Sequence, residues 1–339
     1  MHTQASAWPF NGEGRLRFDA FAQRALFDPV RGYYGRNISS VGQKGDFSTS
    51  ATLSDLLARG ISDWIVKRPE RLPVIEVGAG SGQLAEAILA QDGGKSSLAE
   101  AMAARLSLFA KPKIDYHIVE ESQPLQQQQR ERLRERVTWH SSLGAALESC
   151  GGRALIFSNE LVDAFPPRVF RKEDEGWSEL FLTYSLEEEW EAAERLPPST
   201  VFERQWPVGQ RVEVHDSFRI WQREQFRNFQ EGEVLTIDYG ESVDDLYHRQ
   251  PGGSLRAFLH HQLLEGPDVY RNPGGQDLTC DVNFTDLVDW GEDLGLSKLR
   301  LQTQAEFLEP FSRGTTVDQY LIHTDGAGAI FKVLVQNTT

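Results

Sequence analysis

The sequence predicts an α/β protein with a doubly wound, Rossmann-like, mostly parallel sheet and an added substrate or cap lobe. Short apolar runs that suit buried strands alternate with segments of helical periodicity along most of the chain. A glycine-rich turn joins the first strand of the core to a helix, as at the ligand-binding edge of a parallel sheet. The last two predicted strands close the series, so we expect an antiparallel end to the sheet.

The N-terminal region, residues 1–70, is expected to be a cap of helices and loops. Residues 18–27 have helical periodicity, and an Asp-Pro pair ends that helix because the residue before proline avoids the α region. A second helix is expected over residues 55–65, with Thr52 or Ser54 as its N-cap. The Gly-, Ser- and Thr-rich loop before this helix either forms one wall of a ligand site or is a capped turn.

The first part of the core, residues 71–170, begins with LPVIEVGAGSGQL, which predicts a strand, a glycine turn and a helix. An acid, Glu76, precedes three glycines at alternate positions: Gly78, Gly80 and Gly82. A dinucleotide-binding turn has the form G-x-G-x-x-G, whereas the third glycine here comes one residue early. An acid at this point suits a cationic ligand better than a pyrophosphate. The alternative is a tight turn that binds no ligand.

Three further strands are expected at residues 114–120, 137–140 and 154–158. The first ends at Glu120, where a carboxylate could accept hydrogen bonds from both hydroxyls of a ribose; the alternative is a solvated strand end. Trp139 and His140 end the next strand, near the position expected for an adenine. The intervening helix carries a glutamine run, which we interpret as a polar face.

The strand at residues 154–158 continues into SNELVDAFPP, which is poor material for a protein core. Polar groups at the carboxyl end of a sheet strand point into the ligand crevice, so Asn159, Glu160 and Asp163 are candidate site residues. The alternative is a helix cap with Asp163 facing water.

The remaining chain combines an inserted lobe with the second part of the core. Residues 171–230 are expected to form the lobe, with a hairpin that turns at residues 173–176 and a helix that begins at Asp216. Residues 231–339 return to the core, and within them residues 241–280 are expected to be a loop-rich, lid-like insertion. The final strands are expected at residues 299–304 and 329–335.

Composition narrows the class of protein. The net charge of −15 argues against a nucleic-acid partner. The two cysteines are far apart and the histidines form no ligand cluster, so we expect a reducing compartment and no metal site. No apolar run approaches the ~20 residues that span a bilayer. The N-terminus resembles neither a signal nor a transit peptide, so we expect a cytoplasmic protein without membrane insertion.

Several stretches, in order along nearly the whole chain, resemble the MidA-type methyltransferases, a family that includes the mitochondrial complex I assembly arginine methyltransferase. These stretches are GYY (32–34), GDFSTS (45–50), EVGAGSG (76–82), HIVEES (117–122), SNELVDAFP (158–166), IDYG (237–240), DLTCDVNF (277–284), TQAEFL (303–308) and FKVL (331–334). The sequence departs from the family pattern at residues 51–56 and 254–275, two places that we expect to contact the acceptor.

The resemblance implies a seven-stranded methyltransferase core, a substrate lobe and S-adenosylmethionine as methyl donor. The residues it implies at the cofactor are Glu76, Gly78, Gly80, Gly82, Glu120, Trp139 and His140, together with Gly45, Asp46 and Thr49 of the loop. It also implies a protein methyltransferase that acts on an arginine of a partner protein, with a respiratory-complex subunit as one candidate. A homodimer is one option for the oligomeric state.

An arginine acceptor needs carboxylates, because the guanidinium has a pKa above about 12 and must be gripped, oriented and relieved of a proton. Glu160 and Asp163, three residues apart, should lie on one side of a helical turn, and Asn159 could orient the acceptor or the cofactor. Asp46 is a weaker third candidate. Two other functions stay open: a catalytically weak assembly factor that retains the fold, and a small-molecule methyltransferase.

Overall fold

The computed structural model describes residues 8–36, 55–68, 70–92, 114–259, 262–323 and 326–338. The chain divides into two compact units, which are described one at a time. The lobe unit consists of Met1–Phe47, Glu160–Glu224 and Asp238–Lys298. The core unit consists of Ser48–Asn159, Gln225–Ile237 and Leu299–Thr339.

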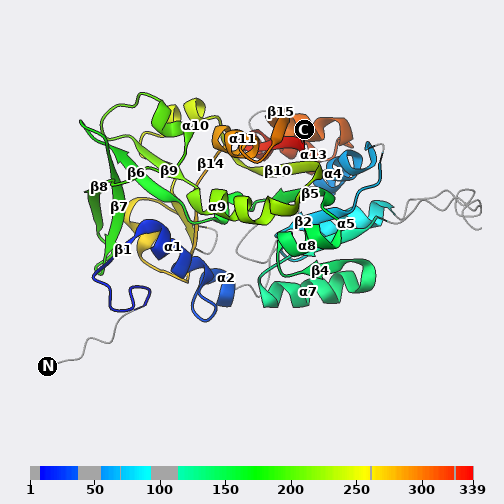
Figure 1. Ribbon diagram of the computed structural model, residues 1–339, viewed down its shortest axis with the longest axis horizontal. Coiled ribbons are helices and arrows are strands. Elements are labelled where there is room, and N and C mark those ends of the chain that lie inside the picture. Colours follow the sequence, from blue (N-terminus) through cyan, green and yellow to red (C-terminus); the bar gives the residue numbers. More distant parts are fainter. Residues whose placement is uncertain are drawn as a thin grey trace, which may run out of the picture. The chain divides into compact units, whose positions relative to one another are not determined.

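The core unit is built on a sheet with the strand order β15-β16-β10-β5-β2-β3-β4 (Figure 1). Its strands are β2 (Val74–Val77), β3 (Tyr116–Val119), β4 (Thr138–His140), β5 (Arg153–Asn159), β10 (Glu231–Glu241), β15 (Leu296–Thr303) and β16 (Phe331–Thr338). Strands β4, β3, β2, β5 and β10 pair in parallel. The Gly232 N–H, at the start of β10, donates to the Thr338 hydroxyl at the end of β16, so β16 runs antiparallel. The expected α/β fold, with its antiparallel end, is confirmed.

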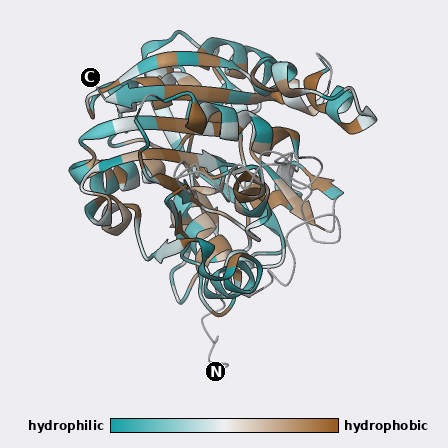
Figure 2. Ribbon diagram, turned by 90° about the vertical axis from the view of Figure 1, so that its right-hand side faces the viewer, coloured by the Kyte–Doolittle hydropathy of each residue, from teal (hydrophilic) through white to brown (hydrophobic). Residues whose placement is uncertain are grey.

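Helices cover the sheet of the core unit. They are α4 (Leu56–Val66), α5 (Gln83–Asp92), α7 (Gln123–Leu133), α8 (Leu143–Ser149), α12 (Gln304–Leu308), α13 (Thr316–Ile322) and α14 (Ala327–Ile330), with 3-10 turns η1 (Arg134–Arg136), η4 (Phe226–Asn228) and η6 (Glu309–Phe311). All four residues of β2 and of β3 are buried, as expected for parallel strands covered on both faces. Hydrophobic segments recur along the strands in Figure 2.

The lobe unit contains a five-stranded antiparallel sheet with the order β1-β7-β6-β9, and β8 pairs with β7. Its elements are β1 (Arg15–Arg17), α1 (Phe18–Phe27), β6 (Arg168–Lys172), β7 (Trp177–Thr183), β8 (Glu188–Ala192), η3 (Thr200–Glu203), β9 (Arg211–Val214) and α9 (Asp216–Gln225). The predicted hairpin is β6–β7 and is confirmed. Strand β8 was not predicted because its sequence, EEWEA, is mostly acidic. Arg171 and Arg211 stack on its Trp190, and Arg211 also pairs with Glu188.

The segment expected to be loop-rich is in fact folded. It holds α10 (Val243–Arg249), β11 (Arg256–Leu259), β12 (Gln262–Leu264), η5 (Gly266–Tyr270) and β13 (Asp277–Thr279). The three strands form their own antiparallel sheet in the order β12-β11-β13. Ala257 and Leu278 of this sheet, with Tyr270, are buried in one hydrophobic cluster with α1. This burial of apolar side chains explains why the segment folds although glycine and proline interrupt it.

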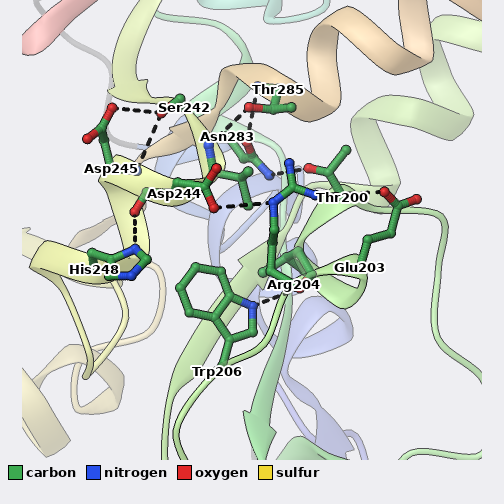
Figure 3. Close-up of polar contacts among 12 residues, drawn as sticks. Thr200, Glu203, Arg204, Trp206, Ser242, Asp244, Asp245, His248, Asn283 and Thr285 are labelled. Atoms are coloured by element: carbon green, nitrogen blue, oxygen red, sulfur yellow. Dashed lines mark hydrogen bonds and ion pairs between the residues drawn. The ribbon is translucent and has the colours of Figure 1, made fainter.

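Side-chain caps fix the segment that follows β13 (Figure 3). Strand β14 (Val282–Asn283) leads into α11 (Phe284–Glu292), and Asn283 caps that helix by accepting from the Thr285 N–H at 3.1 Å. Ser242 caps α10, whose first N–H, that of Val243, donates to the Thr285 hydroxyl at 3.0 Å. These bonds hold the starts of α10 and α11 together and anchor the end of the β13–β14 connection.

Candidate active site

The glycine turn after β2 has the backbone conformation that glycine permits. Gly78, Gly80 and Gly82 have φ values of 74°, 52° and 76°. The Gly78 N–H still donates to the Val119 carbonyl at 2.9 Å, so the turn begins where the β2–β3 pairing ends. A Cβ on Gly82 would lie 3.3 Å from Gln129 and from Leu133, both on α7. The turn is therefore held closely against α7.

Gln129 of α7 connects three parts of this edge of the sheet. Its side chain is fully buried, and Nε2 donates to the Gly80 carbonyl at 2.8 Å and to Glu120 Oε2 at 3.2 Å. Its Oε1 accepts from Trp139 Nε1 at 3.0 Å. The interpretation of the glutamine run as a polar face is thus wrong at Gln129. Leu125, Gln129 and Leu133 are buried at helical spacing, and this stripe was visible in the sequence.

Glu120 follows β3 and is 8% exposed. Its Oε1 accepts from the Ser122 N–H at 3.0 Å, and Oε2 accepts from Gln129. Burial raises its pKa to about 7, against the effect of these donors. Each carboxylate oxygen can accept a further hydrogen bond, so the group retains the capacity that a diol ligand requires.

Glu76 lies within β2 and is 3% exposed. The Tyr116 hydroxyl donates to Glu76 Oε2 at 2.7 Å. Burial raises the pKa of Glu76 to about 7, and the nearby charge of Glu120 contributes in the same direction. Two buried acids, one within β2 and one just after β3, thus lie near the glycine turn, which is an environment that favours a cationic ligand.

Trp139 and His140 point to opposite faces of β4, as successive residues in a strand do. Trp139 bonds to Gln129 of α7, and the Arg130 guanidinium lies 4.5 Å from its ring centroid. The His140 ring stacks on His117, with Nε2 of His140 2.8 Å from Nδ1 of His117. The structure therefore groups Trp139, and not His140, with Glu120 and the glycine turn. Gly45, Asp46 and Thr49 lie outside the described residues.

The second half of SNELVDAFPP belongs to the lobe unit, where Glu160 has a left-handed backbone with φ of 53°. Such a φ is rare for residues other than glycine and is typical of functional turns. Asn159, the last residue of β5, lies opposite Ile237 of β10. The 3-10 turn η2 (Val162–Ala164) follows, and Asp238 Oδ2 accepts its backbone N–H groups, including that of Val162 at 2.9 Å.

Asp163 lies in η2 and is 7% exposed. Its Oδ2 accepts from the Tyr239 hydroxyl and from the Thr279 hydroxyl, the latter at 3.0 Å. Its Oδ1 is buried and has no hydrogen-bond donor at bonding geometry among the described residues. Burial raises the pKa of Asp163. One oxygen of a fixed carboxylate is thus left to accept from another group.

Further polar residues that had no predicted role surround Asp163. Asp277 of β13 is 2% exposed and accepts from the Tyr34 hydroxyl of α2 (Tyr33–Arg36) at 3.0 Å. Burial and the charge of Asp163 raise the pKa of Asp277 to about 8. The guanidinium of Arg256 lies 5.1 Å from the Tyr239 ring centroid. The sequence motifs GYY, IDYG and DLTCDVNF contain Tyr34, Tyr239 and Asp277, whereas Arg256 lies in none of them, and only folding brings these residues together.

Among the described residues, no helix is long and apolar enough to cross a bilayer, and no cluster of three or more metal-ligating side chains occurs.

A family model described as "Putative S-adenosyl-L-methionine-dependent methyltransferase" matches residues 56–302. Among solved structures, a Burkholderia thailandensis protein bound to S-adenosylhomocysteine is 25% identical, with a TM-score of 0.76 over 96% of this chain and 88% of that one. A native crystal structure of an uncharacterized protein from the same organism is 26% identical, with a TM-score of 0.74 over 96% of this chain and 87% of that one.

Curated relatives are about as similar in sequence to this chain as the two solved structures are. The mouse protein arginine methyltransferase NDUFAF7, mitochondrial, is 26% identical over 80% of this chain and 65% of its own length. The bovine protein of that name is 24% identical over 96% of this chain and 73% of its own length. The chain thus spans slightly less than two thirds of the mouse relative. The expectation of a cytoplasmic location is contradicted, since these relatives are named as mitochondrial proteins.

Proposed function

Because the chain belongs to this family of S-adenosylmethionine-dependent methyltransferases, we propose that it methylates an arginine side chain of a partner protein. The expected family and the expected methyl donor are confirmed. The observation that carries the finer proposal is the buried Asp163 carboxylate, one oxygen of which has no donor among the described residues, in an acidic part of the lobe unit. The names of the curated relatives support a protein arginine as acceptor.

The residues beside the glycine turn suit the cofactor. Gly78, Gly80 and Gly82 allow a close approach of the backbone, and Glu120 would accept from the ribose hydroxyls. Trp139 offers an aromatic surface for the base, while Glu76 adds negative charge near the cationic end of the ligand. When bound, S-adenosylmethionine supplies an electrophilic methyl group on a positively charged sulfur.

Three properties of the lobe unit match what a guanidinium acceptor requires. A buried carboxylate oxygen without a donor costs about 1–3 kcal/mol, and a guanidinium N–H can supply that donor. The bond from Tyr239 fixes the Asp163 carboxylate, so it can hold one nitrogen in a constant direction. Glu160, whose backbone is left-handed, supplies a second carboxyl, and its charge, after burial and the charge of Asp163, helps to raise the pKa of Tyr239. Either carboxyl could receive the proton that the nitrogen loses.

The test separates cofactor binding from methyl transfer. The acceptor is first identified by comparing arginine methylation in knockout and wild-type cells by mass spectrometry. Glu160→Gln and Asp163→Asn are then measured with that acceptor. We expect each variant to bind S-adenosylhomocysteine within a few-fold of the wild type and to lose at least a hundredfold in methyl transfer.

Glu175→Gln and Asp174→Asn, in the exposed turn between β6 and β7, are matched controls that should keep wild-type activity. Full activity of both site variants would refute the role of these carboxylates. Loss of S-adenosylhomocysteine binding in both would place them at the cofactor and remove the argument for arginine. Methylated metabolites without methylated protein would favour a small-molecule acceptor.

A further inference from the structure

The face of β13 that carries Asp277 is turned toward η2, which holds Asp163. Residues 277 and 279 are two apart in β13, so their side chains point to the same face of the strand. Thr279 donates to Asp163 Oδ2 at 3.0 Å, which fixes that face toward η2. Burial and the charge of Asp163 raise the pKa of Asp277, which agrees with this placement.

The N-terminal motif GYYG delivers a tyrosine to Asp277. Asp28 turns the chain after α1, and its Oδ1 accepts from the Val30 and Arg31 N–H groups. A Cβ on Gly32 or on Gly35 would lie 2.4 Å from backbone atoms of Asp28, so only glycine fits on either side of the tyrosine pair. Tyr34 also stacks on Phe27, with ring centroids 5.3 Å apart. Its hydroxyl is therefore held in position at Asp277.

The carboxyl groups of this cluster outnumber the cations that the described residues supply. Asp163, Asp277 and Asp238 are all buried carboxyls. Arg256 is the cation that acts on Asp163 and Asp277, but it bonds to Asp281 at 2.6 Å and to the Ser254 carbonyl at 3.1 Å. Buried carboxyls are stable in the charged form only when they are paired. The cluster is thus suited to receive one more cation.

We infer that Asp277, held by Tyr34, is a second carboxylate of the acceptor site, and that it acts together with Oδ1 of Asp163, which has no donor in the described part of the chain, to select a guanidinium. This inference rests on the proposed function. A guanidinium carries five N–H donors in one plane, so a single carboxylate cannot satisfy it, whereas carboxylates from β13 and η2 can accept from two of its sides. A compact ammonium matches such a planar arrangement less well.

Titration of Asp277 supports the same role. With its pKa raised to about 8, Asp277 is largely protonated at neutral pH when no cation is bound. A guanidinium would lower that pKa and release a proton. The groups that act on Asp277 come from each neighbouring element: Tyr34 of α2, Asp163 of η2 and Arg256 of β11.

The test measures binding of a small probe, N-acetyl-arginine amide, by saturation-transfer NMR in the presence of S-adenosylhomocysteine. N-acetyl-citrulline amide is the matched probe, because its urea has the same planar shape without the charge. We expect the wild type to bind the arginine probe at least tenfold more tightly than the citrulline probe. Asp277→Asn should reduce this ratio below threefold, while the affinity for S-adenosylhomocysteine stays within twofold.

Tyr34→Phe is a second variant, and we expect it to lower the affinity for the arginine probe at least threefold. It tests the role of Asp277 if Asp277→Asn does not fold. Asp174→Asn and Tyr184→Phe are the exposed controls, which should retain the wild-type ratio. An undiminished ratio in both site variants, with a loss in Asp163→Asn, would overturn the role of Asp277 and leave the proposed function standing. An equal affinity of the wild type for both probes would overturn the arginine function and this inference together.

Discussion

Gln129→Glu tests whether the buried glutamine of α7 organises the cofactor side of the core unit. The substitution keeps the size of the side chain and its Oε1, which accepts from Trp139. It replaces the amide nitrogen that donates to the Gly80 carbonyl at 2.8 Å and to Glu120 at 3.2 Å. Two donors are therefore lost, and a second acidic group is placed beside Glu120.

The expected loss follows from these two bonds. A neutral hydrogen bond contributes about 1 kcal/mol, and a bond to a charged group contributes about 1.5–3 kcal/mol. Their sum is roughly 2.5–4 kcal/mol, shared between the free energy of unfolding and the binding of cofactor. If half of it falls on binding, the Kd for S-adenosylhomocysteine rises by about tenfold or more, since 1.4 kcal/mol is a factor of ten.

The assay is calorimetric titration with S-adenosylhomocysteine, combined with thermal unfolding without ligand. Gln127→Glu is the matched control, because Gln127 is exposed on the same helix and bonds only weakly to Glu131, at 3.3 Å. We expect the control to change the unfolding free energy by less than about 0.5 kcal/mol. If Gln129→Glu binds S-adenosylhomocysteine within threefold of the wild type and melts at the same temperature, Gln129 does not organise the turn.

Three further predictions concern other residues of the two units. Gly80→Asp adds a side chain where the backbone must approach the ligand, so calorimetry should show no S-adenosylhomocysteine binding although the protein stays folded; unchanged affinity would refute the assignment of the turn. Glu120→Ala should weaken binding at least tenfold, and a change under threefold would mean that another group holds the ribose. Asp277→Asn should gain thermal stability over the wild type as pH rises from 6 to 8.5. The folded wild type keeps the proton up to a pKa of about 8, whereas the unfolded chain loses it near 3.8, so the wild type loses stability through that window. If the free energy of unfolding of the variant minus that of the wild type stays constant or falls from pH 6 to 8.5, the burial of Asp277 is contradicted.

The local pattern of the sequence determined the core of this protein. The glycine turn at Gly78 to Gly82, the strands around it and the hairpin of the lobe follow from short-range signals: apolar runs, turn residues and helical spacing. Strand β8 and the sheet formed by β11, β12 and β13 do not follow from such signals. Their sequences are acidic or interrupted by glycine and proline, and the pairing of strands that are close in the sequence, together with their side-chain packing, stabilises them.

Among the polar groups of the candidate site, some could be found from the local sequence and others only from the tertiary structure. Asn159, Glu160 and Asp163 were predicted as candidate site residues because they lie at the end of a buried strand or just after it, and their role stays a prediction. The burial of Gln129 could have been predicted from its spacing with Leu125 and Leu133, but its three partners could not. Only the tertiary structure brings Tyr34 to Asp277, which lies 243 positions further along the chain. Contacts over such separations depend on how helices and strands pack, and no local pattern of residue types encodes them.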